Sequence, residues 1–205
     1  GRTQWQAALD IVERLMPRAL FVWGPDHADT LAIKATYASA LSGLGRDEEA
    51  IDVLEDVLAT SIRVFGDGHE NTFVARNNLS VALMYEKRFA RAEEILRESL
   101  ASLDGESDPV GVLQCEMSLA AALENLGRLD ESLQMYEAAQ ASLVDLAGET
   151  HPQTLITRNN MAMLFIKLGR VDQAVEMARS VLELGQEHHP ESRINVFPFG
   201  SNLGR

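Results

Sequence analysis

Residues 45–54 read GRDEEAIDVL, and three later stretches can be laid directly on them: KRFARAEEIL from Lys87, GRLDESLQMY from Gly127 and GRVDQAVEMA from Gly169. Successive copies start 42, 40 and 42 residues apart. A fixed period of this length is typical of one supersecondary unit repeated along the chain. Stacked repeats form a long surface and not a sealed catalytic pocket, so the period favours a binding function.

Each copy reads as two helices joined by a short turn. The first helix is expected over residues 30–44, 72–86, 112–126 and 154–168, and the second over residues 47–64, 89–103, 129–146 and 171–185. Three of the turns contain glycine, which suits the left-handed residue that ends a helix. The second copy has Lys87 at that place, so we expect its turn to be strained or differently closed.

Small residues recur at one position of each helix, where they would allow neighbouring helices to approach to about 8–10 Å. In the first helices these residues are Ala38, Ser80, Ala120 and Ala162, and in the second helices they are Ala50, Ala92, Ser132 and Ala174. Large apolar residues three or four positions away complete a core stripe on each helix.

A second recurring piece joins the copies and reads GPDHADT from Gly24, GDGHENT from Gly66 and GETHPQT from Gly148. Glycine ends the preceding helix, and Asp, Asn or Thr can cap the next one. One histidine in each copy would lie in a separate layer, whereas zinc needs three or four ligands around one point. We therefore predict no metal site here.

Together, the small-residue positions, the LGR turns and the G-x-x-H-x-x-T linker resemble the tetratricopeptide repeat, in the long 42-residue form of kinesin light chains and of many bacterial multidomain regulators. The common unit has 34 residues. The resemblance implies an all-α fold, a right-handed superhelical solenoid of antiparallel helix pairs whose first helices line a concave groove. Residues 1–23 are then the second helix of an incomplete preceding repeat, and the four repeats are residues 24–65, 66–105, 106–147 and 148–190. Residues 1–190 would form one repeat domain, and residues 191–205 an extended or disordered tail.

The resemblance also implies which side chains face the groove. Arg76-Asn77-Asn78 recurs as Arg158-Asn159-Asn160, and asparagine amides can hydrogen-bond an extended peptide backbone. The first Asn of each pair is favoured for this role; the alternative is that one Asn of each pair bonds a neighbouring repeat. Further inward rows are Ser39, Val81, Ala121 and Met163; Ser42, Met84, Glu124 and Ile166; and Gly43, Tyr85, Asn125 and Lys167. The predicted peptide-binding residues are Asn77, Asn159, Asn78, Asn160, Met84, Tyr85, Met117, Asn125, Met163, Ile166 and Lys167.

Composition limits the partners. A formal net charge of -13 argues against nucleic acid and anionic membrane surfaces, and no apolar run approaches the roughly 20 residues of a membrane span. The single cysteine, Cys115, cannot form an internal disulfide and reads as a buried filler in a reducing compartment. The chain has no Walker loop, dinucleotide fingerprint or HExxH sequence. We therefore predict a cytoplasmic protein that is not an enzyme, with no cofactor, whose partner is a protein or an extended peptide with apolar anchors.

Two functions of different classes stay open. The first is a non-enzymatic scaffold module, a fragment of a larger protein, that binds its partner along the concave groove. The second is a ligand-gated regulatory domain that controls an attached effector such as a kinase, a signalling ATPase or a DNA-binding domain. Self-association is left open too, either through the exposed ends of the solenoid (Trp5, Leu9 and Met16) or through the tail, where Phe197 and Phe199 could occupy a groove.

Overall fold

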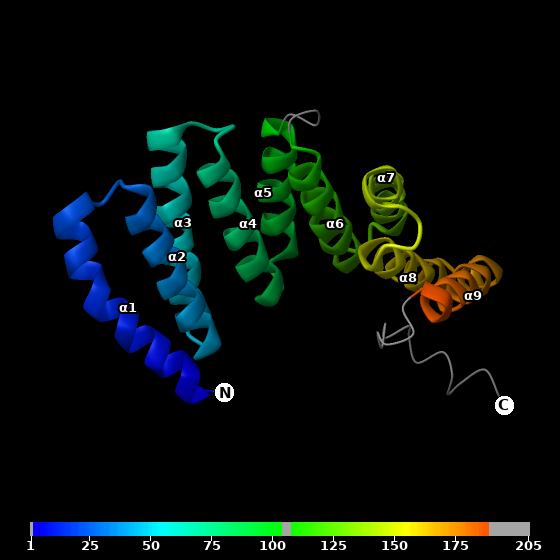
Figure 1. The fold of residues 1–205 in the computed structure, drawn as a ribbon, viewed down its shortest axis with the longest axis horizontal. Helices are drawn as coiled ribbons and strands as arrows, with labels where there is room; N and C mark the ends of the chain where they lie inside the picture. The colour runs from blue at the N-terminus through cyan, green and yellow to red at the C-terminus, as the bar shows by residue number, and fades with distance from the viewer. Residues whose placement is uncertain (1, 104–107, 189–205) are drawn as a thin grey trace. The chain divides into compact units, whose positions relative to one another are not determined.

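The computed structural model describes residues 2–103 and 108–188, and within these residues it contains helices and no strands. The all-α prediction is confirmed, and each helix begins and ends within three residues of its expected range (Figure 1). The predicted tail, residues 191–205, lies outside the described residues. The helices are α1 (Arg2–Trp23), α2 (Ala28–Gly43), α3 (Asp47–Phe65), α4 (Glu70–Tyr85), α5 (Phe89–Ser102), α6 (Pro109–Asn125), α7 (Leu129–Ala147), α8 (Pro152–Lys167) and α9 (Val171–His188).

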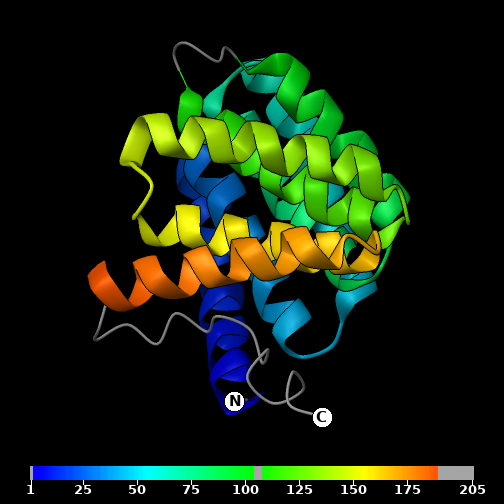
Figure 2. The ribbon, with the colours of Figure 1, turned by 90° about the vertical axis from the view of Figure 1, so that its right-hand side faces the viewer.

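The chain divides into two compact units, residues 1–103 and residues 104–205. In the first unit α1 to α5 pack against one another in chain order. In the second unit α6 to α9 do the same, and Figure 2 shows α8 and α9 side by side. Each unit therefore has the neighbour-on-neighbour packing of a repeat protein. The division of residues 1–190 into four repeats of one domain stays a prediction.

The small residues predicted at the helix crossings are all buried. The two serines among them do not leave unpaired hydroxyls, since Ser132 Oγ donates to the Ala120 carbonyl at 2.8 Å and Ser80 Oγ to the Asn77 carbonyl at 2.9 Å. Larger side chains at these crossings would force the helices apart. The repeat spacing thus predicts correctly which residues lie where neighbouring helices contact each other.

The turn within each helix pair closes in the same way in all four copies. A backbone N–H donates to the carbonyl five residues earlier, as from Arg88 to Leu83 at 2.8 Å and from Arg128 to Leu123 at 3.0 Å. The preceding residue has a positive φ: 78° at Gly127, and 59° at Lys87. The turn without glycine is therefore strained and not differently closed.

The Lys87→Gly variant should be more stable than the wild type by about 0.5–1 kcal/mol, because glycine adopts the left-handed conformation without the steric cost that a Cβ atom brings. Urea unfolding followed by circular dichroism measures the change. Lys87→Ala is the control, since it removes the long side chain but keeps the Cβ atom. Equal stability of the glycine and alanine variants would contradict the strain at this turn.

The recurring linker histidines cap the helices that follow them. Nδ1 of His27, His69 and His151 accepts the backbone N–H two residues later at 3.1 to 3.2 Å. The expectation that Asp, Asn or Thr caps these helices was wrong, because the histidine is the residue with extended backbone at each helix start. In two of the three linkers the threonine donates instead to the linker glycine: Thr72 Oγ1 to the Gly66 carbonyl at 2.6 Å and Thr154 Oγ1 to the Gly148 carbonyl at 2.9 Å. Capping accounts for the recurrence of the histidines.

Candidate functional site

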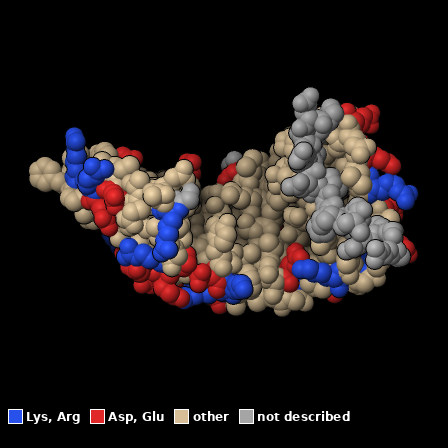
Figure 3. Space-filling view, turned by 90° about the horizontal axis from the view of Figure 1, so that it is seen from below, with Lys and Arg blue, Asp and Glu red and all other residues tan. Residues whose placement is uncertain are grey.

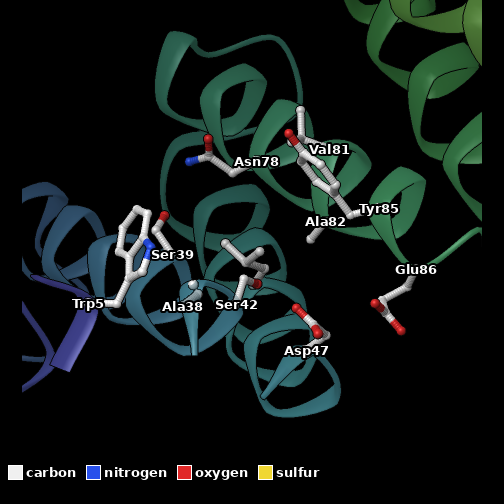
Figure 4. Close-up of a pocket in the computed structure, with 12 residues that line it drawn as sticks. Trp5, Ala38, Ser39, Ser42, Asp47, Asn78, Val81, Ala82, Tyr85 and Glu86 are labelled. Atoms are coloured by element: carbon white, nitrogen blue, oxygen red, sulfur yellow. The ribbon is translucent and has the colours of Figure 1, made fainter. Parts of the chain in front are cut away.

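A cavity of about 500 Å³ opens in the first unit between α2, α3 and α4, beside the N-terminal part of α1 (Figure 4). Its lining is mostly apolar, with one amide and two carboxylates. The lining residues are Trp5, Ala38, Ser39, Ser42, Gly43, Asp47, Leu54, Asn78, Val81, Ala82, Tyr85 and Glu86.

Helical spacing explains how α2 and α4 build this cavity. On α4 the lining residues Val81, Ala82 and Tyr85 follow Asn78 by three, four and seven positions, so they share one face of the helix with it. On α2 the lining residues are all small: Ala38, Ser39, Ser42 and Gly43. Because the side chains of α2 that face α4 are small, open space is left between the two helices.

Trp5 of α1 forms one wall of the cavity. Its indole packs directly on the backbone of Gly43, since a Cβ atom at that position would come 2.2 Å from Trp5 Cδ2. The absence of a side chain at Gly43 therefore makes room for the ring. Trp5 remains 43% exposed, so part of its apolar surface is accessible from the cavity.

The second unit uses the equivalent positions differently. A shift of 82 residues aligns Leu54 with Tyr136, Asn78 with Asn160, Ser42 with Glu124 and Tyr85 with Lys167. Tyr136 is buried and is hydrogen-bonded by the Asn160 side chain. Lys167 Nζ lies 2.7 Å from Glu124 Oε1. Polar groups that would face a cavity in the second unit are thus bonded to one another.

The environment of Tyr136 agrees with a buried hydroxyl that is hydrogen-bonded within the protein. Burial and, to a lesser extent, the nearby Glu124 carboxylate raise the pKa of Tyr136 to about 12, against the opposite effect of the hydrogen bond from Asn160. The hydroxyl therefore stays protonated at neutral pH and pairs with the amide. In the first unit Leu54 has no group that could pair with Asn78.

The structure brings two of the predicted residues of the first unit, Asn78 and Tyr85, to the cavity. Ser39, Ser42, Gly43 and Val81, predicted as inward-facing, also line it. Asn77 is half-buried on α4 and is not a lining residue, and Met84 packs on the core of the unit. The lining asparagine is thus the second of the pair and not the favoured first one.

Most of the predicted residues of the second unit have structural contacts. Met117 Sδ accepts from Gln153 Nε2 at 3.6 Å, and Asn125 Nδ2 donates to the Ala121 carbonyl of its own helix at 2.8 Å. Asn160 and Lys167 pair with Tyr136 and Glu124 as described above. Asn159 and Met163 are half-buried, and Ile166 is exposed.

Sequence reasoning missed the two ends of the cavity. Trp5 comes from the helix before the first complete pair, and Asp47 and Glu86 flank the turns, so none of them lies in an inward row of the first helices. A signal was available for Glu86, because the other three copies have leucine at that position: Leu44, Leu126 and Leu168.

The arginine that precedes each Asn pair is structural. Arg76 is 2% exposed and donates to the Asp67 carbonyl at 3.0 Å, to Ser102 Oγ at 3.2 Å and to the Asp67 carboxylate. Arg158 lies 3.5 Å from Glu149 in the same arrangement. Each arginine therefore connects the linker to the helix that follows it, α4 for Arg76 and α8 for Arg158.

Several exposed Lys and Arg side chains of the first unit are paired with Asp or Glu side chains. Lys and Arg side chains are interspersed with Asp and Glu on the face that Figure 3 presents. The pairs include Lys34 with Asp56 and Arg63 with Asp26, both at 2.7 Å. The hydrogen bond from Arg63 lowers the pKa of Asp26, so this carboxylate is ionised at neutral pH.

A tetratricopeptide repeat profile matches residues 36–104 and 113–187, so the chain belongs to the tetratricopeptide repeat family, as predicted. Among solved structures, the kinesin light chain TPR-like repeats of Podosopora anserina resemble it with a TM-score of 0.79 at 21% identity, over 91% of this chain and 90% of that chain. BtubC (BKLC) from P. vanneervenii has a TM-score of 0.78 at 20% identity, over 90% and 74% of the two chains.

A Rap protein complexed with Competence and Sporulation Factor has a TM-score of 0.69 at 12% identity, over 91% of this chain and 50% of the Rap chain. At these identities the likeness shows a shared fold. A comparison with curated protein sequences gave no match. None of the described helices is long and apolar enough to cross a membrane.

Proposed function

We propose that this tetratricopeptide repeat chain is a non-enzymatic, cytoplasmic protein-interaction module that holds an extended segment of a partner protein in the cavity of the first unit. The observation that carries the proposal is an open, mostly apolar cavity of about 500 Å³ whose wall contains an amide, Asn78, that is not hydrogen-bonded to any described residue. This volume lies within the range of known ligand sites.

Asn78 is the group that would bind the partner backbone. Its side chain makes no hydrogen bond to any residue that the structure describes, and Leu54 beside it offers none. An amide presents both donors and an acceptor, so it can pair with a peptide N–H and carbonyl without selecting a side chain. The equivalent Asn160 has already formed its bond to Tyr136, which removes it from this role.

The apolar walls would hold a large side chain of the partner. Tyr85 is 81% exposed, and Val81 and Trp5 are also exposed. Burying such surfaces is the main favourable contribution to most protein association. The Rap complex supports the proposal, because a protein of similar fold is seen there with a bound factor. Met84, Met163 and Ile166 stay predicted apolar anchors.

The Asn78→Ala variant should bind a partner peptide about five to ten times more weakly than the wild type, the scale of one or two neutral hydrogen bonds. Random peptides of about ten residues, roughly 33 Å when extended, are displayed on phage and selected on the full chain. The affinity of a selected peptide for each variant is then measured by isothermal titration calorimetry.

Asn77→Ala is the matched control, since it removes the neighbouring amide, which lies outside the cavity. Weakening by Asn77→Ala alone would assign backbone binding to the row favoured by the sequence and contradict the cavity site. Failure to select any peptide, or equal affinity of both variants and the wild type, would contradict the proposed function.

A further inference from the structure

Two carboxylates, Asp47 and Glu86, lie at the end of the first-unit cavity opposite Trp5 (Figure 4). Asp47 is the first residue of α3, and Glu86 is the C-cap residue of α4. They come from different helices and line the same cavity. Its apolar section therefore ends in two acidic groups.

Neither carboxylate is neutralised by a described residue. Asp47 and Glu86 have no hydrogen bond or ion pair with the part of the chain that the structure describes. The arginines adjacent to the turns are already bound elsewhere: Arg46 to both oxygens of Glu49 at 2.7 Å, and Arg88 to Glu48. Lys87, which follows Glu86, makes no ion pair with a described residue either, so both carboxylates at this end of the cavity stay available to a cation of the partner.

The Glu86 carboxylate makes no hydrogen bond or ion pair with a described residue that would stabilise the end of α4. The C-terminal end of a helix carries a partial negative charge, so an acidic group there is unfavourable. Leu44, Leu126 and Leu168 occupy the same position in the other copies. A cation placed beside Glu86 would interact favourably with both the carboxylate and the end of α4.

Asp47 adds a fixed charge to the same end. It lies in the first turn of α3, at the end of the helix where acidic side chains are commonly found. An acidic partner segment would be repelled here, whereas a basic one would be attracted. The net charge of -13 acts in the same direction on a partner approaching from solution.

We propose that the partner segment bound in the first-unit cavity carries a Lys or Arg next to a large apolar side chain, and that Asp47 and Glu86 bind this cation. The apolar side chain packs between Trp5, Val81 and Tyr85, and Asn78 pairs with the backbone. This inference rests on the proposed function and specifies the chemistry of the partner.

The test uses the same display of random peptides on the full chain. Peptides selected on the wild type should be enriched in Lys or Arg within a few positions of a large apolar residue. On the Asp47→Asn/Glu86→Gln variant the basic enrichment should disappear. A peptide selected on the wild type should bind this variant about ten times more weakly, and its affinity for the wild type should fall as salt is raised.

The Asp52→Asn/Glu55→Gln variant is the matched control, because it removes the same number of negative charges from exposed positions of α3 outside the cavity. Its affinity should stay within about twofold of the wild type. Equal weakening of both double variants would show a general charge effect and overturn the inference.

Two further outcomes separate the inference from the proposed function. Peptides that bind in the cavity, as shown by weakening in Asn78→Ala, but that lack a basic preference would overturn the inference and leave the proposed function standing. The absence of any selected peptide would overturn both.

Discussion

Replacing Arg76 by alanine should lower the free energy of unfolding by about 3 kcal/mol, because it removes a buried charged group that joins three parts of the first unit. The guanidinium donates to the Asp67 carbonyl and carboxylate in the linker and to Ser102 Oγ at the end of α5. Hydrogen bonds that involve a charged group contribute about 1.5–3 kcal/mol each, and alanine also loses the packing of the side-chain stem.

Two features keep the expected loss below the sum of these contributions. The Asp67 side chain is 62% exposed, so water can solvate its carboxylate once the arginine is gone. Arg76 Nε is buried without a hydrogen-bond partner, so the wild type already bears a desolvation cost that the variant removes.

Urea unfolding followed by circular dichroism gives the measurement. Arg91→Ala is the matched control, since Arg91 is an exposed arginine paired with Glu94 at 2.8 Å, and its removal should change stability by less than about 0.5 kcal/mol. Arg158→Ala should lie between the two, because Arg158 is 11% exposed and its contact with Glu149 is long, at 3.5 Å. If Arg76→Ala and Arg91→Ala lowered the free energy of unfolding equally, the result would contradict a stabilising role for the Arg76 hydrogen bonds between the linker and the helices.

The fold could be predicted from the sequence because it depends on what the copies share. Ala50, Ala92, Ser132 and Ala174 recur at one position and are all buried where two helices cross. Such positions follow from a period that is visible in the chain itself. The helix caps were harder to predict, since a cap is decided by which residue has extended backbone, and His69 precedes other good capping residues such as Asn71.

The candidate site depends instead on where the copies differ. Leu54 and Tyr136 occupy equivalent positions, and this difference decides whether the neighbouring amide faces a cavity or a hydroxyl. The sequence pattern also could not decide whether Asn77 or Asn78 lines the cavity. Adjacent residues of a helix point about 100° apart, so a shift of one position moves a side chain out of the cavity.

The largest effect on binding is expected from giving the first unit the packing of the second. In the triple exchange Ser42→Glu, Leu54→Tyr and Tyr85→Lys, the new tyrosine can bond Asn78 as Tyr136 bonds Asn160, and the new Glu and Lys can pair as Glu124 and Lys167 do. The larger groups at positions 42 and 54 then fill the space between α2, α3 and α4.

The triple variant should bind selected peptides at least about ten times more weakly than the wild type, a loss of about 1.4 kcal/mol or more. Its stability should stay within about 1 kcal/mol of the wild type, since each introduced group has a partner. Calorimetry with the selected peptide and urea unfolding measure the two quantities on the same protein.

The reverse exchange in the second unit, Glu124→Ser, Tyr136→Leu and Lys167→Tyr, is the control. It should leave peptide affinity unchanged and lower stability by about 1–3 kcal/mol, because Asn160 loses its partner in a packed site. A folded triple variant of the first unit with full affinity would show that the peptide binds outside the cavity. Loss of affinity in the first-unit exchange alone, with stability retained, would show that peptide binding depends on the cavity of the first unit.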